Sequence, residues 1–104
     1  MNLRDLLADA SGQLDNVETT LTPDGAITWA RAGRPFSVLA ADGASAEFGL
    51  DPAVAAAAVR TPDVEPSSRG AGWVAFAPAD LDDHAADRAV AWLASAHRRL
   101  GPRD

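Results

Sequence analysis

A loop of small residues at positions 67–72 (Ser-Ser-Arg-Gly-Ala-Gly) has the composition of an anion-binding segment. Small side chains let backbone N–H groups approach an anion, and the Arg69 guanidinium would add a bidentate contact. The loop leads into a strand-like run at Trp73, and the chain has no lysine, so it is not a P-loop. We expect either an anion or partner site formed by Ser67, Ser68, Arg69 and Trp73, or a flexible connection.

A structural role for Arg69 would require a carboxylate partner, and Asp63 and Glu65 are the nearest candidates along the chain. An exposed pair of this kind contributes only about 0–1 kcal/mol to stability. The two roles therefore predict different effects for the substitution Arg69→Ala.

A second group of candidate residues precedes this loop. Trp29 and Arg31 share a strand face by the two-residue period, and Arg34 follows shortly after. Together with Arg69 and Trp73 they would form an arginine–aromatic surface for an acidic partner or a nucleic acid. The alternative keeps both tryptophans in the core and leaves the arginines to solvate the strand ends.

Catalytic and metal-binding patterns are poor. Asp80, Asp83, His84 and Asp87 share a helix face at a spacing that could hold a divalent metal, although acids near a helix start equally suit the helix dipole. His84 and His97 lie about 20 Å apart along one helix, so they cannot share a site within the chain. We expect no catalytic residues, no metal and no cofactor, and hence a protein that is not an enzyme.

Composition limits the class of protein. The 104 residues are 47% hydrophobic, which is typical of one globular domain spanning residues 1–104. The chain has no cysteine, its first residues include acids, and no apolar run approaches a membrane span, so we expect a cytoplasmic protein. Nine basic and fifteen acidic residues give a net charge of −6, which disfavours nucleic-acid binding.

Hydrophobic periodicity predicts the order α-β-β-β-β-α-β-α. This order indicates an α+β fold in which an antiparallel sheet of about five strands has helices on one face. The other face is left open to solvent or to a partner. The predicted helices cover residues 2–10, 52–60 and 80–100, and the predicted strands cover 17–21, 27–29, 36–40, 46–50 and 73–77, with a break at 33–35 and a loop at 61–72.

Two of the helices have clear sequence signals. Asp51 and Pro52 provide an N-cap and a first helical residue, and Val54, Ala57 and Ala58 are expected to point inward. The last helix has one apolar stripe with Trp92 at its centre, so we expect Trp92 in the core. The stripe consists of Leu81, Ala85, Ala89, Trp92, Leu93, Ala96 and Leu100.

Asp51-Pro52 opens an alanine-rich helix, and Arg69 stands shortly before Trp73-Val74. In these residues and in the order of its elements, the chain resembles the MmcQ/YjbR-like family of small bacterial proteins, over roughly residues 26–100. The resemblance implies a compact fold similar to CyaY-like domains, and it implies DNA binding only by fold analogy. The chain departs from the family at 67–73 and at 95–97, where the family has other residues around its tryptophan and a Ser-Tyr pair. The matching features are Asp51-Pro52 before an alanine-rich helix ending at Arg60, then Pro62-Asp63-Val64-Glu65-Pro66, Arg69, Trp73-Val74 and the closing helix.

Three functional hypotheses follow. The first is a non-enzymatic interaction module, monomeric or homodimeric, that binds a protein or an acidic ligand through the open sheet face. The second is a DNA-binding protein, which only the family resemblance implies. The third is a small anionic-ligand binder or enzyme with a site at the 67–73 loop.

Overall fold

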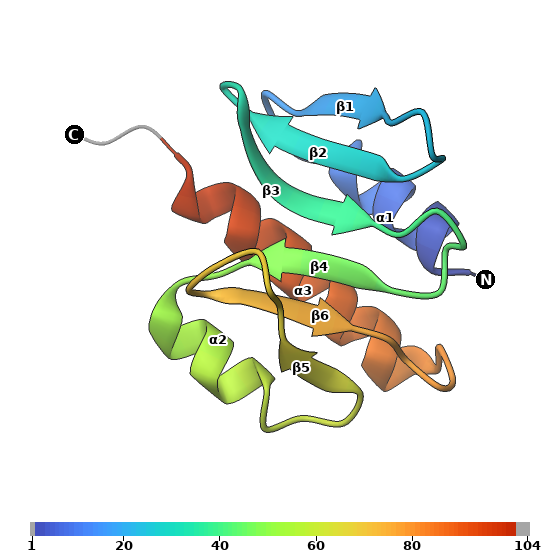
Figure 1. The fold of residues 1–104 in the computed structure, drawn as a ribbon, viewed down its shortest axis with the longest axis vertical. Coiled ribbons are helices and arrows are strands. Elements are labelled where there is room, and N and C mark those ends of the chain that lie inside the picture. Colours follow the sequence, from blue (N-terminus) through green and yellow to red (C-terminus); the bar gives the residue numbers. More distant parts are fainter. Residues whose placement is uncertain (1, 102–104) are drawn as a thin grey trace.

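The computed structural model describes residues 2–101, and this part of the chain forms an α+β fold (Figure 1). Its elements, in chain order, are α1 (Leu3–Ser11), β1 (Glu18–Leu21), β2 (Ile27–Arg31), β3 (Arg34–Leu39), β4 (Ala46–Gly49), α2 (Pro52–Ala58), β5 (Val64–Pro66), β6 (Trp73–Phe76) and α3 (Asp83–Arg99).

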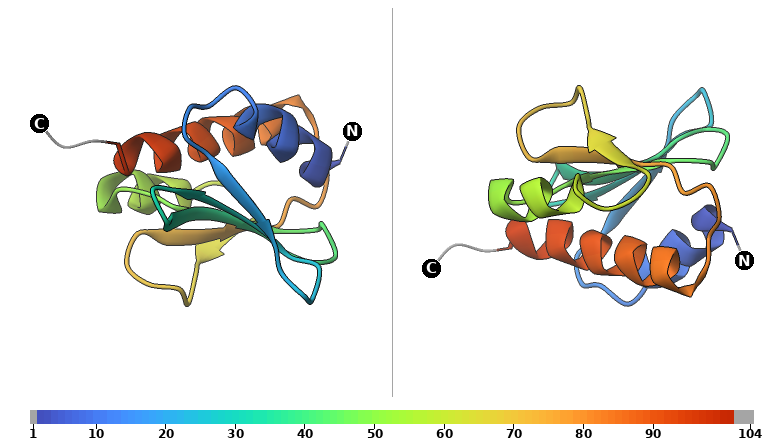
Figure 2. Two further views of the ribbon diagram at one scale, coloured as in Figure 1. Left: turned by 90° about the horizontal axis from the view of Figure 1, so that it is seen from above. Right: turned by 90° about the horizontal axis from the view of Figure 1, so that it is seen from below.

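The strands form one antiparallel sheet in the order β1-β2-β3-β4-β6-β5. All three helices lie on the same side of this sheet, and no helix in residues 2–101 covers the other side (Figure 2). The predicted α+β class and the helices on one face are therefore confirmed. We call the uncovered side the helix-free face.

Strand β5 was not predicted, because it lies within the expected loop at 61–72. Val64 is 7% exposed and pairs with Phe76 of β6, so a buried apolar residue fixes this short strand at the sheet edge. Pro66 ends β5, as suits a residue that cannot donate a ladder hydrogen bond. The following residues, 67–72, project on the helix-free side (Figure 2).

The predicted break at 33–35 is wrong, because β3 already begins at Arg34. The connection is the two-residue turn Ala32-Gly33, and both residues have a positive φ, 52° and 76°. A type I′ hairpin turn requires this conformation. Arg31 and Arg34 are consequently a directly opposed pair at the end of β2 and β3.

The regular two-residue alternation of a strand is also interrupted in β3. The β2–β3 register shifts between Trp29 and Ala30, so β3 has an extra residue there. Such a bulge changes which way the side chains point. Phe36 thereby contacts α3, while Val38 pairs with Glu47 on the helix-free face.

The helix starts differ from the expected ones in detail. α3 begins at Asp83 and not at Asp80, because the Asp82 side chain accepts a hydrogen bond from the Ala85 N–H and makes the N-cap. In α2 the buried residues are Ala55 and Ala58, and Val54 packs against the core as expected, whereas Ala57 is exposed. None of the helices in residues 2–101 combines the length and apolarity that a membrane span requires.

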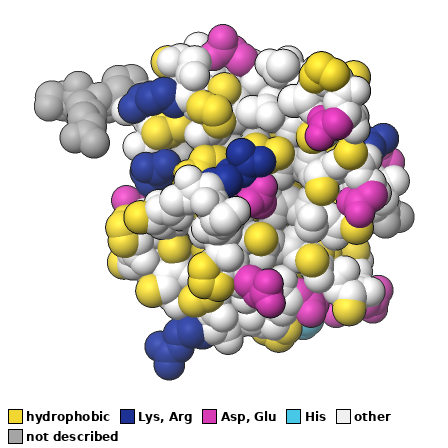
Figure 3. All heavy atoms as spheres, viewed as in Figure 1, with side chains coloured by type: hydrophobic (Ala, Val, Ile, Leu, Met, Phe, Trp, Pro, Cys, Tyr) yellow, Lys and Arg dark blue, Asp and Glu magenta, His cyan; other side chains and the backbone are white. Residues whose placement is uncertain are grey.

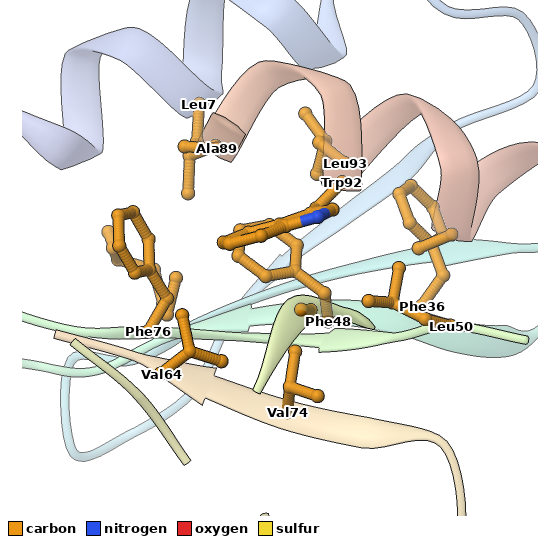
Figure 4. Packing of buried hydrophobic residues seen from close by; sticks show 14 of the residues in the cluster. Leu7, Phe36, Phe48, Leu50, Val64, Val74, Phe76, Ala89, Trp92 and Leu93 are labelled. Carbon is orange, nitrogen blue, oxygen red and sulfur yellow. The ribbon is translucent and has the colours of Figure 1, made fainter. Parts of the chain in front are cut away.

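The core lies between the sheet and the helices, with Trp92 of α3 near its centre (Figure 4). The Trp92 ring meets Phe76 edge-on at 5.3 Å between centroids and Phe48 at 6.0 Å. Leu7 of α1 and Leu93 of α3 are fully buried around it. The prediction that Trp92 is a core residue is confirmed.

Candidate functional site

Trp73, the first residue of β6, lies opposite Gly49 of β4. A Cβ atom at Gly49 would lie 2.9 Å from indole atoms Cε2 and Cζ2, so the indole lies over the position where any other residue would have its side chain. Because Gly49 leaves this space free, Trp73 rests on the sheet and stays only partly buried.

Arg69 is held beside Trp73 by a carboxylate. Its Nε donates to Glu47 Oε2 at 2.7 Å, and its guanidinium carbon lies 5.8 Å from the centroid of the Trp73 ring. The expected partners Asp63 and Glu65 are wrong: the partner comes from β4, which is 22 residues away in sequence. This ion pair is the only one in residues 2–101, and 45% of the Arg69 side chain remains exposed.

The loop at 67–72 is tied to the sheet and is not a free connection. Ser67 Oγ donates to Glu47 Oε1 and accepts from the Arg69 N–H. The backbone closes the loop through Ser67 N–H to Trp73 O at 2.9 Å and Trp73 N–H to Gly70 O at 3.2 Å. Ser68 is exposed at its tip.

Gly72 fixes the end of this loop. Its φ is 83°, and a Cβ there would lie 2.3 Å from the carbonyl oxygen of Leu50. The Leu50 N–H donates to Gly72 O at 2.9 Å. Residue 72 must therefore be glycine for the loop to reach this position next to Trp73.

Arg99, at the end of α3, is a neighbour of Trp73 that the sequence analysis missed. Its Nε donates to Gly49 O at 3.1 Å, and its Nη2 lies 3.2 Å from the position that a Gly49 Cβ would take. The indole reaches the same position, so Trp73 and Arg99 are adjacent. We name Glu47, Gly49, Arg69, Trp73 and Arg99 the Trp73 surface. Figure 3 is drawn from the helix-free side and shows arginine, acidic and hydrophobic side chains gathered near the middle of this face.

The sequence contained one signal for Arg99, since it stands in the last turn of an amphipathic helix. A basic residue in the last turn also suits the helix dipole, so this signal by itself does not indicate a place on the surface near Trp73. Arg99 binds Gly49, and Gly49 pairs with Trp73, so the end of α3 lies near the indole. This arrangement depends on the register between β4 and β6.

Arg31 and Arg34 do not join the Trp73 surface. Arg31 Nη1 donates to the carbonyl oxygen of His97 at 3.1 Å, and Arg34 Nη2 donates to that of Leu100 at 3.0 Å. Trp29 is 1% exposed and belongs to the core. The five residues expected to form one arginine–aromatic surface are thus divided, and the two arginines bind the end of α3 instead of merely solvating strand ends.

His97 is buried, whereas His84 is exposed near the other end of α3. Arg31 can only donate, so His97 Nδ1 accepts from it, and Nε2 has the proton that bonds the Asp15 carbonyl. In the described part of the chain, no three His, Cys, Asp or Glu side chains are grouped to hold a metal ion, and this includes the acids around His84.

Comparison of the sequence with models of known protein families gives no match, and comparison with curated proteins finds no similar sequence.

Proposed function

We propose that this chain is a non-enzymatic binding module that takes an acidic segment of a protein partner on the Trp73 surface. One observation supports this most: a partly exposed tryptophan lies on the helix-free face with the guanidinium of Arg69 over its ring, while the guanidinium of Arg99 binds Gly49, the residue opposite Trp73. Tryptophan and arginine are the residues that most often dominate the energy of protein interfaces.

Charge favours an acidic partner at this position. Two arginines and one glutamate give the Trp73 surface a positive balance, although the chain as a whole has a net charge of −6. Glu47 binds Arg69 through Nε, and in residues 2–101 no hydrogen bond occupies the terminal nitrogens of Arg69. These nitrogens are donors held in a defined position, as bidentate recognition of a carboxylate needs.

The loop geometry supports a preformed site. Ser67, Glu47 and Gly72 hold residues 67–72 against the sheet, so the chain does not need to order this loop when a partner binds. A preformed surface loses less conformational entropy on binding, which favours affinity.

Two further parts of the proposal rest on the sequence. A location in the cytoplasm is supported by the lack of cysteine. Membership of the MmcQ/YjbR-like family is supported by the motifs between Asp51 and Val74, and a sheet with helices on one face is compatible with the fold that this family implies.

A comparative capture experiment tests the proposal. Wild type, Arg69→Ala, Trp73→Ala and the control Arg60→Ala are used as baits in extracts of the source cells, after nuclease treatment. Arg60 is a suitable control because it is an exposed arginine beyond the end of α2. We expect a protein that wild type and Arg60→Ala retain and that the other two lose.

The recovered partner is then titrated against each folded variant. We expect Arg69→Ala and Trp73→Ala to raise the Kd at least about tenfold, which corresponds to about 1.4 kcal/mol. Equal affinity for all four proteins would contradict the proposal. Capture that depends on nucleic acid would support the DNA-binding hypothesis in its place.

A further inference from the structure

A pocket of about 620 Å³ lies where the β2–β3 turn, the connection between α1 and β1, and the end of α3 meet. This volume is in the range of small-molecule sites, about 300–1,000 Å³. The pocket contains none of the residues of the Trp73 surface. Its wall includes Asn16, Val17, Glu18, Arg31, Arg34 and Leu100.

Two arginines, Arg31 and Arg34, belong to this wall. Arg31 and Arg34 are direct cross-strand partners on either side of the Ala32-Gly33 turn. Like charges at opposed positions of a sheet destabilise it. No carboxylate in residues 2–101 lies within 4.0 Å of either guanidinium, so the described chain leaves this pair of positive charges uncompensated by an acid.

The end of α3 orients both arginines, but its carbonyl oxygens bind only one guanidinium nitrogen of each. Arg31 binds the carbonyl oxygen of His97 through Nη1, and Arg34 binds that of Leu100 through Nη2. These contacts suit the negative end of the helix dipole. Within residues 2–101 the other guanidinium nitrogens have no hydrogen-bond partner, so they are available to a ligand in the pocket.

Glu18 limits the charge of such a ligand. Its Oε1 accepts from the Gly33 N–H at 2.8 Å, so the carboxylate is held at the turn and is not paired with an arginine. Two positive groups and one negative group leave one net positive charge. A ligand with a single negative charge matches this wall better than a doubly charged phosphate.

The rest of the wall is apolar. Val17 is partly buried and Leu100 is 8% exposed, and Ala32 also borders the pocket. A hydrocarbon body would lie against these side chains while its acidic group faces the arginines. Asn16, at the border of the pocket, has φ 58°, and such sparsely populated backbone conformations occur preferentially at ligand sites.

We infer that this pocket binds a small monocarboxylate with an apolar body, its carboxylate held by Arg31 and Arg34. This inference is independent of the proposed partner on the Trp73 surface.

The test uses octanoate, benzoate and inorganic phosphate as probes, with the full-length protein and NMR amide shifts as the readout. We expect a carboxylate to bind with a Kd of about 1 mM or lower and to shift the amides of Val17, Gly33 and Leu100. Arg34→Gln should raise this Kd about tenfold, since a charged hydrogen bond is lost. Val17→Glu should abolish binding by placing a second acid in the wall.

Arg60→Gln is the control, and it should bind the carboxylate like wild type. Two results would overturn the inference: no saturable carboxylate binding by wild type up to about 10 mM, a tenfold margin over the expected Kd, or a preference for phosphate. Unchanged affinity in a folded Arg34→Gln or Val17→Glu protein would also overturn it. The shift map of wild type needs no variant, so the inference stays testable if Arg34→Gln does not fold.

Discussion

Two glycines determine where Trp73 lies. Gly49 leaves open the space under the indole, and Gly72 lets the loop pass within contact of the Leu50 carbonyl oxygen. At either position a Cβ would meet atoms closer than 3.0 Å. The proposed binding surface therefore depends on residues that would not themselves touch a partner.

We predict that Gly72→Ala destabilises the fold by more than about 2 kcal/mol, because it combines a left-handed backbone with a clash against backbone. Gly43→Ala is a matched control: its φ is 73°, but no atom lies within 4 Å of the new Cβ. Gly43→Ala should cost only about 1 kcal/mol. Urea unfolding measures both, and equal losses would contradict the steric argument.

For Arg69→Ala we predict a stability loss of at most about 1 kcal/mol, since its ion pair with Glu47 is partly exposed to solvent. Trp73 should become more accessible, because the guanidinium beside its ring is removed. Acrylamide quenching reports this selectively, since Trp29 and Trp92 are buried. Unchanged quenching, or a loss above about 2 kcal/mol, would show that Arg69 has a different structural role.

The sequence predicted which residues form the candidate site, but it did not predict their contacts. The loop of small residues indicated Arg69 and Trp73 as site residues, but it did not indicate which carboxylate binds Arg69. Asp63 and Glu65 are near in sequence, whereas Glu47 is near in space because β6 pairs with β4. A contact across 22 residues depends on strand register, and local sequence does not determine register when strands are short.

Helix α3 is the element on which both candidate sites depend. One face of it packs Trp92, Leu93 and Ala96 into the core. Its last turn places Arg99 beside Trp73, and its final carbonyl groups bind Arg31 and Arg34. Displacement of α3 should therefore disturb both sites together.

We predict that Trp92→Ala destabilises the domain by about 3–5 kcal/mol, because it leaves a cavity between α3 and the rings of Phe48 and Phe76. Val90→Ala, on the exposed side of the same helix, should change stability by less than about 0.5 kcal/mol. Thermal unfolding compares the two. A shift of only a few degrees for Trp92→Ala would contradict its place in the core.

Elements with strong periodicity were predictable, and those set by tertiary context were not. The stripe of α3 and the alternating residues of β2 and β4 follow directly from burial on one face. Strand β5 has only three residues, the last of which is Pro66, so it lacks a pattern long enough to detect. The bulge of β3 opposite Trp29 and Ala30 results from packing, and α3 starts at Asp83 because Asp82, one of several candidate caps, makes the N-cap.

The whole molecule has a net charge of −6. The arginines of the two candidate sites lie in two small areas, one with Arg69 and Arg99 and the other with Arg31 and Arg34. We predict no specific duplex DNA binding at about 150 mM salt, because the Trp73 surface can neutralise too few phosphates. A fluorescence titration with random and defined duplexes measures this. Sub-micromolar, sequence-dependent binding would reverse the order of the first two functional hypotheses.

Hydrogen exchange of the complex shows whether a partner binds the helix-free face at Trp73, as we propose. The full-length protein is compared alone and with its captured partner. We expect slower amide hydrogen exchange in β4, in β6 and in the loop at 67–72, and unchanged exchange in α1. Protection confined to α1 or to the Ala32-Gly33 turn, with unchanged exchange around Trp73, would contradict binding at the Trp73 surface.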